Sequence, residues 1–240
     1  MNKLILSFAA LSAFGLSAAP ALADAITLDA SSIGTNYTLT YNGFSSGTPI
    51  SGLTGSTTFK LTAISGNNYT FDYSVANTSS SPITGSRISS FAFNTDPNIT
   101  SAASTGAFSY TTLNSNYPNG IGTVDVCFKD ALTGSCAGGG SGGLTIGQSG
   151  TGSFTLSFSQ PISALTLSDF YVRYQSISGA GGITSASGAG TLSSTSTSSG
   201  GTSVPEPGML GLMSAGLIAT ALLRRRRHPA LVAAVRPTYS

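Results

Sequence analysis

The chain of 240 residues has very few of the side chains on which common enzyme mechanisms depend. It has no tryptophan, and its single histidine and single glutamate, His228 and Glu206, lie near the C-terminal end. The first 227 residues therefore contain no histidine. This excludes nucleophilic catalysis by a Ser-His-Asp or Cys-His set there, and it excludes zinc held by histidines. A pair of aspartates could still cleave a glycosidic bond, but we expect Asp125 and Asp130 to be solvated surface residues. We therefore predict no catalytic residues and no cofactor.

Charged residues are also scarce, at 8% of the chain. The formal net charge is +2, but six of the ten positive residues lie in the end segments: Lys3, Arg224, Arg225, Arg226, Arg227 and Arg236. Between Asp24 and Val204, four cations stand against seven aspartates, which gives a net charge of −3. The positive balance of the whole chain is therefore no argument for nucleic-acid binding.

A metal site is not indicated either. Hard cations need clustered oxygen ligands, and the aspartates are scattered with no Asp-x-Asp run. Asp96-Pro97-Asn98 offers a few oxygens, but its composition is typical of a turn. We predict no metal ligands.

The longest apolar run near the C-terminus is bounded by two distinctive motifs. Val204-Pro205-Glu206-Pro207 precedes it, the run itself extends over 15 residues from Met209 to Leu223, and Arg224-Arg225-Arg226-Arg227 ends it. As a helix it is about 22 Å long, against about 30 Å for a bilayer core. It could span a locally thinned bilayer if the arginine side chains reach the surface. The arginines place its C-terminal end in the cytoplasm, so everything before Pro205 is expected outside.

The N-terminal segment fits an exported chain. Lys3 supplies a positive end, Leu4 to Leu16 an apolar core, and Ala21-Leu22-Ala23 a small-residue cleavage pattern. Cleavage after Ala23 would leave Asp24 as the new N-terminus. We therefore expect residues 1–23 to be a signal peptide, used by the Sec translocon and removed by signal peptidase.

The C-terminal order of proline motif, apolar helix and arginine cluster resembles the PEP-CTERM sorting signal, which is read by the membrane transpeptidase exosortase. The resemblance implies a transient inner-membrane anchor over residues 204–227 and a product on the cell surface or in the matrix of a Gram-negative bacterium. It also implies a setting of exopolysaccharide and biofilm. The chain departs from the pattern in continuing from His228 to Ser240, which we expect to be a cytoplasmic tail. An ordinary single-pass anchor with a proline-rich linker is the alternative.

The segment between the two ends has the alternation typical of β-strands with one buried face. Phe59, Leu61 and Ala63 alternate with polar residues, and the same pattern recurs in two further runs: Tyr69, Phe71, Tyr73 and Val75, and Phe154, Leu156 and Phe158. Turn signals separate such runs at four places: Asn42-Gly43, Ser65 to Asn68, Ser81-Pro82 and Asn119-Gly120. We predict an all-β domain over residues 24–175, with eight to ten strands in an antiparallel, jelly-roll-like β-sandwich.

Residues 176–203 are nearly all Ser, Gly, Thr and Ala. Such a composition buries little apolar surface. We predict a stalk here, with one further strand around residues 188–192 as an option and flexible chain from Ser193 onward.

The two cysteines, Cys127 and Cys136, are predicted to form a disulfide, because an even count in an exported chain favours one. Closing this short loop is worth about 2.7 kcal/mol on the chain-entropy model. In the strand expected at residues 121–129, Val124, Val126 and Phe128 share one face, and Cys127 shares the other with Asp125 and Lys129. If the first set faces the core, the disulfide lies at the surface. A metal-binding or redox pair is the alternative, but the spacing is long and no histidine is near.

The cysteine pair resembles the so-called cistern group of PEP-CTERM proteins when it is taken with two other segments, Ala25 to Asp29 and Asp169 to Ser176. That group is defined by sequence and export signal, so the resemblance implies no further activity.

Two classes of function remain. The first is a structural surface or matrix protein associated with exopolysaccharide. The second is a carbohydrate-binding module, whose platform would need tyrosines such as Tyr171 or Tyr174 because tryptophan is absent. These two tyrosines lie on opposite faces of one expected strand, so only one of them could serve.

Overall fold

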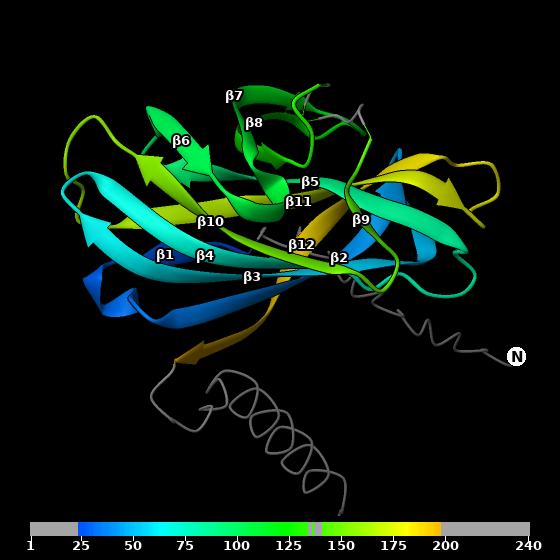
Figure 1. Ribbon diagram of the computed structural model, residues 1–240, viewed down its shortest axis with the longest axis horizontal. Helices are drawn as coiled ribbons and strands as arrows, with labels where there is room; N and C mark the ends of the chain where they lie inside the picture. Colours follow the sequence, from blue (N-terminus) through cyan, green and yellow to red (C-terminus); the bar gives the residue numbers. More distant parts are fainter. Residues whose placement is uncertain (1–23, 134–135, 137–140, 198–240) are drawn as a thin grey trace, which may run out of the picture. The chain divides into compact units, whose positions relative to one another are not determined.

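The computed structural model describes residues 24–133, 136 and 141–197, and the regular secondary structure of these residues is almost entirely β-strand (Figure 1). The predicted signal peptide, sorting signal and tail lie outside this range. Within it, no helix is both long and apolar enough to cross a bilayer. The prediction of an antiparallel all-β sandwich is confirmed.

The described residues contain twelve strands, more than the eight to ten predicted, because three of them are only two to four residues long. The strands are β1 (Ile26–Leu28), β2 (Thr35–Ser45), β3 (Thr48–Ser65), β4 (Asn68–Asn77), β5 (Gly85–Asp96), β6 (Ser101–Ser104), β7 (Tyr110–Tyr117), β8 (Gly122–Lys129), β9 (Leu144–Thr145), β10 (Ser149–Ser157), β11 (Leu165–Ser178) and β12 (Ser185–Thr197). Two short 3-10 helices, η1 (Ala30–Ser32) and η2 (Gly106–Phe108), connect them.

All strand pairs are antiparallel, and they form one continuous sheet in the order β6-β10-β4-β3-β2-β12-β11-β5-β8-β7. β1 joins it at β11, and β9 joins it at β5. The sheet bends back on itself into a nearly closed sandwich, so that strands distant in the order face one another across the core (Figure 1).

Aromatic rings from both layers fill the core. The ring of Phe59 on β3 lies 5.7–6.0 Å from the rings of Phe91 and Phe93 on β5, Phe154 on β10 and Phe170 on β11. Such tilted and stacked contacts stabilise a core beyond the area that they bury. The alternating apolar positions predicted from the sequence, such as Phe59, are buried, with the exception of Ala63, which is exposed.

Three of the four predicted turns are confirmed, and the fourth is wrong. Gly66-Asn67 joins β3 to β4, residues 118–121 join β7 to β8, and Ser81-Pro82 interrupts the chain between β4 and β5. Asn42-Gly43 instead lies inside β2, where a Cβ on Gly43 would overlap the side chain of Leu53. Gly43 is therefore a packing glycine. The actual turn is Ser46-Gly47, where both residues have positive φ.

The predicted domain boundary at residue 175 and the stalk from residue 176 are wrong as far as Thr197, although the optional strand around residues 188–192 is present as part of the longer β12. β11 continues to Ser178, and β12 lies between β11 and β2 inside the sheet. The small residues of β12 allow this position, since a Cβ on Gly188 would be 2.9 Å from Tyr174 and one on Gly190 would be 2.8 Å from Tyr41. The glycines that suggested a stalk are therefore required by close packing against large tyrosines.

Candidate functional site

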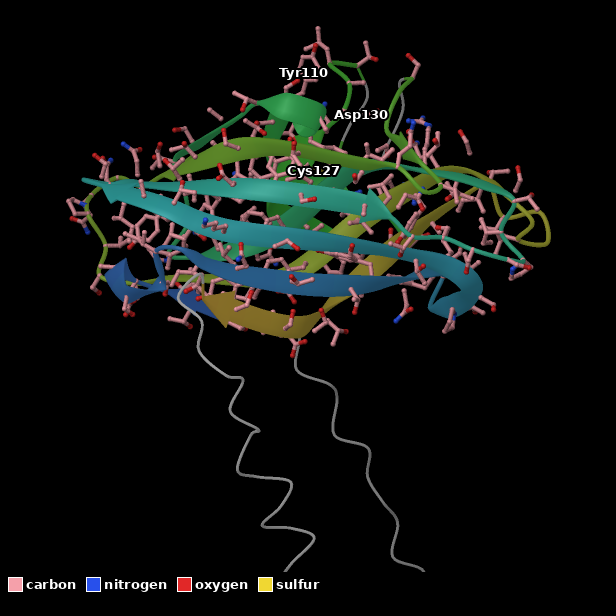
Figure 2. All side chains as sticks on the ribbon, turned by 60° about the horizontal axis from the view of Figure 1, so that its bottom comes forward. Tyr110, Cys127 and Asp130 are labelled. Atoms are coloured by element: carbon pink, nitrogen blue, oxygen red, sulfur yellow. A yellow bond between two sulfur atoms is a disulfide. The ribbon has the colours of Figure 1, made fainter. Side chains whose placement is uncertain are left out.

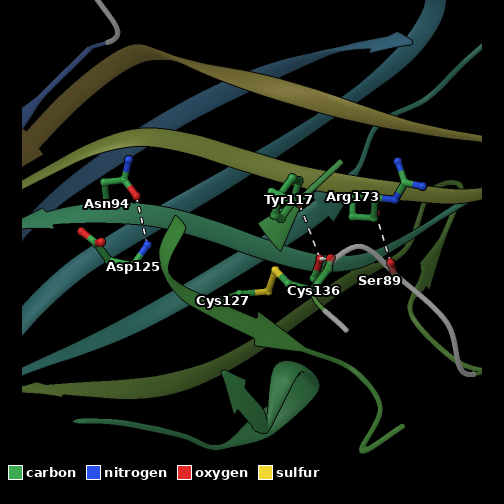
Figure 3. The surroundings of a disulfide bond; sticks show 8 residues. Ser89, Asn94, Tyr117, Asp125, Cys127, Cys136 and Arg173 are labelled. Carbon is green, nitrogen blue, oxygen red and sulfur yellow. Dashed lines mark hydrogen bonds between the residues drawn. A yellow bond between two sulfur atoms is a disulfide. The ribbon is translucent and has the colours of Figure 1, made fainter. Parts of the chain in front are cut away.

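The predicted disulfide between Cys127 and Cys136 is present, with the two Cα atoms 6.0 Å apart (Figure 3). Its expected surface position is wrong, because both cysteines are fully buried. They pack in a small second cluster with Ala92 on β5, Tyr117 at the end of β7 and Val124 on β8. The disulfide therefore joins the segment around Cys136 to an internal strand of the sheet.

The face that Val124 occupies also differs from the prediction. Val126 and Phe128 belong to the main core as expected, whereas Val124 belongs to the second cluster. The pairing of β8 with β5 ends at Val126, and beyond that point β8 pairs only with β7. The ladder with β7 is also irregular here, because Asn114, between the paired residues Leu113 and Ser115, has a positive φ of 47°.

A buried arginine lies beside this cluster. Arg173 on β11 is only 7% exposed, and the Asn119 amide oxygen accepts hydrogen bonds from its Nη1 at 3.2 Å and from the backbone N of Ser187 at 3.0 Å. Burial lowers the pKa of Arg173 and raises that of Tyr117, whose ring lies 5.7 Å from that of Tyr171. The Asn119 amide in the β7–β8 turn thus forms hydrogen bonds with residues of β11 and β12.

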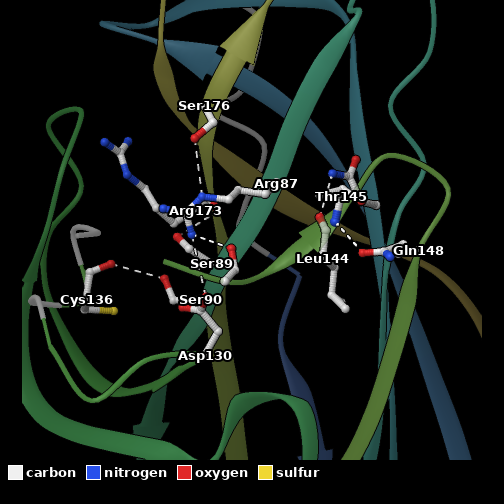
Figure 4. Close-up of polar contacts among 12 residues, drawn as sticks. Arg87, Ser89, Ser90, Asp130, Cys136, Leu144, Thr145, Gln148, Arg173 and Ser176 are labelled. Carbon is white, nitrogen blue, oxygen red and sulfur yellow. Dashed lines mark hydrogen bonds and ion pairs between the residues drawn. The ribbon is translucent and has the colours of Figure 1, made fainter. Parts of the chain in front are cut away.

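A second charged group is formed by Arg87 and Asp130 (Figure 4). Arg87 Nη1 on β5 lies 3.6 Å from Asp130 Oδ2, and the same nitrogen donates to the carbonyl of Gly142 at 2.6 Å. Both side chains are largely buried, so the prediction that Asp130 is a solvated surface residue is wrong. Burial raises the pKa of the Asp130 carboxyl, and the nearby Arg87 opposes that shift.

The other aspartate considered for catalysis, Asp125, also has internal contacts. Its Oδ2 accepts a hydrogen bond from the backbone N of Thr95 at 2.8 Å, and its own backbone N donates to Asn94 Oδ1 at 3.0 Å. It links β8 to β5 at the point where their backbone pairing stops. These contacts explain Asp125 as a structural residue of the sheet.

The tyrosines proposed for a carbohydrate platform differ in their exposure to solvent. Tyr174 is fully buried in the main core, which removes it as a platform residue. Tyr171 is half-buried against Tyr117. Tyr110, on β7, is the tyrosine that the described part of the chain leaves most accessible, at 38% (Figure 2).

Asp24 is described, unlike the other residues of the predicted cleavage site. Its Oδ2 accepts a hydrogen bond from the backbone N of Leu192 on β12 at 2.5 Å. Ala21 and Ala23 lie outside the described residues, as do the sorting motif Val204 to Pro207 and the cluster Arg224 to Arg227. Asp96 is the last residue of β5, and the chain bends at Pro97 directly after it. Among the described residues, no three His, Cys, Asp or Glu side chains gather as a metal site would need.

The sequence carried no signal for the pairing of Asn119 with Arg173 and Ser187. Arg173 and Ser187 are each more than 50 positions from Asn119, and only the strand order brings them to it. Asn119-Gly120 predicted the turn, but it did not indicate which residues the Asn119 side chain contacts.

The described domain is thus a β-sandwich with a buried disulfide, which suits an exported chain. Residues 203–227 match the family model of the PEP-CTERM protein-sorting motif. The chain is accordingly a PEP-CTERM domain-containing protein. It is an exported substrate of exosortase, with a transient membrane-anchored sorting signal and a destination at the cell surface. No curated protein and no solved structure matches the chain.

Proposed function

We propose that the mature domain is a structural, non-catalytic protein of the extracellular matrix, associated with exopolysaccharide and hence with biofilm, in a Gram-negative bacterium. The observation that carries this proposal is that the cysteines and several charged side chains form internal structural contacts. The two cysteines form a buried disulfide, and Arg87, Asp130 and Arg173 lie in internal contacts beside it. The outward positions of β3, β4 and β10 are left mainly to Ser and Thr.

The surface supports the same proposal. The large hydrophobic side chains that the described residues expose are Ile33, Tyr110 and Leu132, and they lie on three different segments. Scattered single residues of this kind do not make a patch for a lipid or a large apolar partner. A hydroxyl-rich, weakly charged surface suits contact with a hydrated polymer.

A carbohydrate-binding module on the same scaffold is the second candidate. The exposed ring of Tyr110 on the edge strand β7 favours it, because a tyrosine face can stack on a sugar ring. Tyr171 is a weaker candidate, since its ring packs on Tyr117.

Cosedimentation with exopolysaccharide purified from the producing culture tests both candidates. The mature protein recovered from the cell surface is expected to sediment with the polymer, and cells that lack the protein are expected to form a weaker matrix. Saturable binding that Tyr110→Ala or Tyr171→Ala abolishes would favour the module. A mature protein that stays entirely in the supernatant would overturn both.

A further inference from the structure

The outer face of five neighbouring strands, β10, β4, β3, β2 and β12, is an ordered array of hydroxyl groups. In one row across the strands the facing residues are Thr151, Ser74, Thr58, Thr38 and Ser194, and in the next they are Ser149, Ala76, Ser56, Thr40 and Thr191. On β10, β4, β3 and β2 the residues between them point inwards to the core, whereas β12 has a register shift between Leu192 and Ser194 that leaves Ser193 exposed as well. We call this surface the hydroxyl face. Figure 2 shows its strands side by side, from gold β12 and blue β2 at the lower edge upwards.

Neighbouring hydroxyls on this face are held by one another. Thr38 and Thr58 share a hydrogen bond of 3.0 Å, and Thr70 and Thr155 share one of 3.1 Å. A hydroxyl has one donor and two acceptor positions, so each pair keeps capacity for an outside partner. Neighbouring strands lie about 4.8 Å apart, and successive residues on the same face of one strand lie about 6.7 Å apart. The array is therefore regular, and its β-branched side chains have few rotamers to lose on binding.

The hydroxyl face is almost neutral. Its charged side chains are Lys60 on β3 and Asp72 on β4, which are direct cross-strand neighbours and cancel each other. Such a face gives no electrostatic attraction to an anionic or a cationic polymer. The large exposed hydrophobics Ile33, Tyr110 and Leu132 all lie on other segments, so it also lacks the apolar core with which a second copy would be held.

We infer that the hydroxyl face is the surface that binds the exopolysaccharide, and that it selects a long, uncharged polysaccharide. This inference rests on the proposed matrix function. It names the surface of the domain that contacts the exopolysaccharide.

The energetics of hydroxyl contacts set the length requirement. A protein–sugar hydrogen bond replaces bonds to water, so its net worth is only about 0.5–1.5 kcal/mol. A short oligosaccharide touching one row is bound too weakly to persist in solution. A polymer that spans several rows of one molecule links several such contacts in one binding event, and linked contacts raise affinity by about 10²–10⁴-fold without any new type of contact. This mode of binding needs no aromatic platform.

The test variant removes two hydroxyl pairs while keeping side-chain shape: Thr38→Val, Thr58→Val, Thr70→Val and Thr155→Val. The matched control is Thr27→Val with Thr166→Val, a cross-strand hydroxyl pair 3.3 Å apart on β1 and β11, outside the hydroxyl face. A second test variant, Thr40→Arg, places a bulky side chain at an exposed position in the middle of the face, with exposed Thr27→Arg as its control. This pair gives an answer even if the fourfold variant fails to fold.

Each variant is produced as the full-length precursor, and the mature chain recovered from the cells is cosedimented with purified exopolysaccharide. The polymer is divided into neutral and acidic fractions and tested intact or after mild acid cleavage to short fragments. We expect the unaltered protein to sediment with the intact neutral fraction and not with its fragments. Both test variants should lose at least tenfold in bound fraction, and both controls should bind normally.

Three results would overturn the inference. If the unaltered protein binds and both test variants bind equally well, the contact lies elsewhere, and the proposed matrix function stands. Preferential binding to the acidic fraction would show that charge rather than hydroxyls selects the polymer. A change of molar mass in light scattering on Thr40→Arg, with polysaccharide binding intact, would assign the face to a second copy. No binding by the unaltered protein would remove the proposed function itself.

Discussion

Arg173 keeps a positive charge within the wall of the sandwich, and the Asn119 amide is one of the groups that accept hydrogen bonds there. We expect Asn119→Gly to lower the free energy of unfolding by about 1–3 kcal/mol, because it leaves buried donors without that acceptor. Glycine is chosen because Asn119 has a φ of 65°, which glycine adopts without strain. Chemical denaturation of the purified domain measures the change.

Asn119→Asp is the matched control for this prediction. It keeps an acceptor oxygen and adds a negative charge facing Arg173, so its stability should stay near that of the unaltered protein. Equal stability of the glycine variant and the unaltered protein would contradict the role given to the amide.

Three buried tyrosines determine the behaviour at high pH. Burial raises the pKa of Tyr41, Tyr117 and Tyr174 above the ordinary value of 10.0. Above pH 10 the unfolded chain loses these phenol protons while the folded chain keeps them, so stability that is complete below pH 10 declines as the pH rises. The expected slope is about 1.4 kcal/mol per pH unit for each tyrosine.

Tyrosinate absorbance, followed together with circular dichroism, checks this. The three phenols should ionise only as the β signal is lost. Ionisation of all tyrosines near pH 10 in a chain that remains folded would contradict the burial.

At the scale of single residues, the sequence predicted which apolar side chains are buried but not which polar ones are. Strict alternation is enough to place Phe59 and Phe71 in the core, since it depends only on neighbours in the chain. The burial of Arg173 and Asp130 depends on strands that meet only after folding, and a single charged residue in a strand gives no sign of it.

At the scale of elements, the disulfide fixes the segment around Cys136 to β8. Its removal by Cys127→Ala with Cys136→Ala is expected to cost about 2–4 kcal/mol, from the loop entropy and the lost packing of two fully buried side chains. In the native protein, a reductant should release almost no alkylatable thiol until denaturant is added, because both sulfurs are shielded. Prompt alkylation without denaturant would show that the site is open to solvent.

β12 shows how composition can mislead about an element. Ser, Gly, Thr and Ala are typical of a stalk when the chain is taken alone, yet here they form a strand between β2 and β11. The need for small side chains comes from Tyr41 and Tyr174, which pack against Gly188 and Gly190. That requirement is invisible without knowing which strands are neighbours.

A truncation pair follows from the position of β12. A chain of residues 24–175 lacks this internal strand and should fail to fold, because β2 and β11 would both lose a partner. A chain of residues 24–199 should unfold cooperatively. The measurement is circular dichroism during heating, and a cooperative transition in the shorter chain would contradict the assignment of β12 to the sheet.

At the scale of the whole molecule, the chain is expected to have a lasting part and a temporary part. The folded sandwich extends at least from Asp24, whose carboxylate meets β12, to Thr197. The sorting motif begins at residue 203, so the predicted stalk of 28 residues shrinks to the few residues between these limits. The C-terminal sorting motif could be recognised from the sequence because it is a local pattern, whereas the extent of the folded part could not. The N-terminal signal peptide stays a prediction.

The mass of the chain recovered from the cell surface tests this division most directly. We predict a product that begins at Asp24, ends near Pro205 to Pro207 and contains one intact disulfide. An inner-membrane protein that keeps its tail through Ser240 would contradict the account and leave a plain membrane-anchored domain.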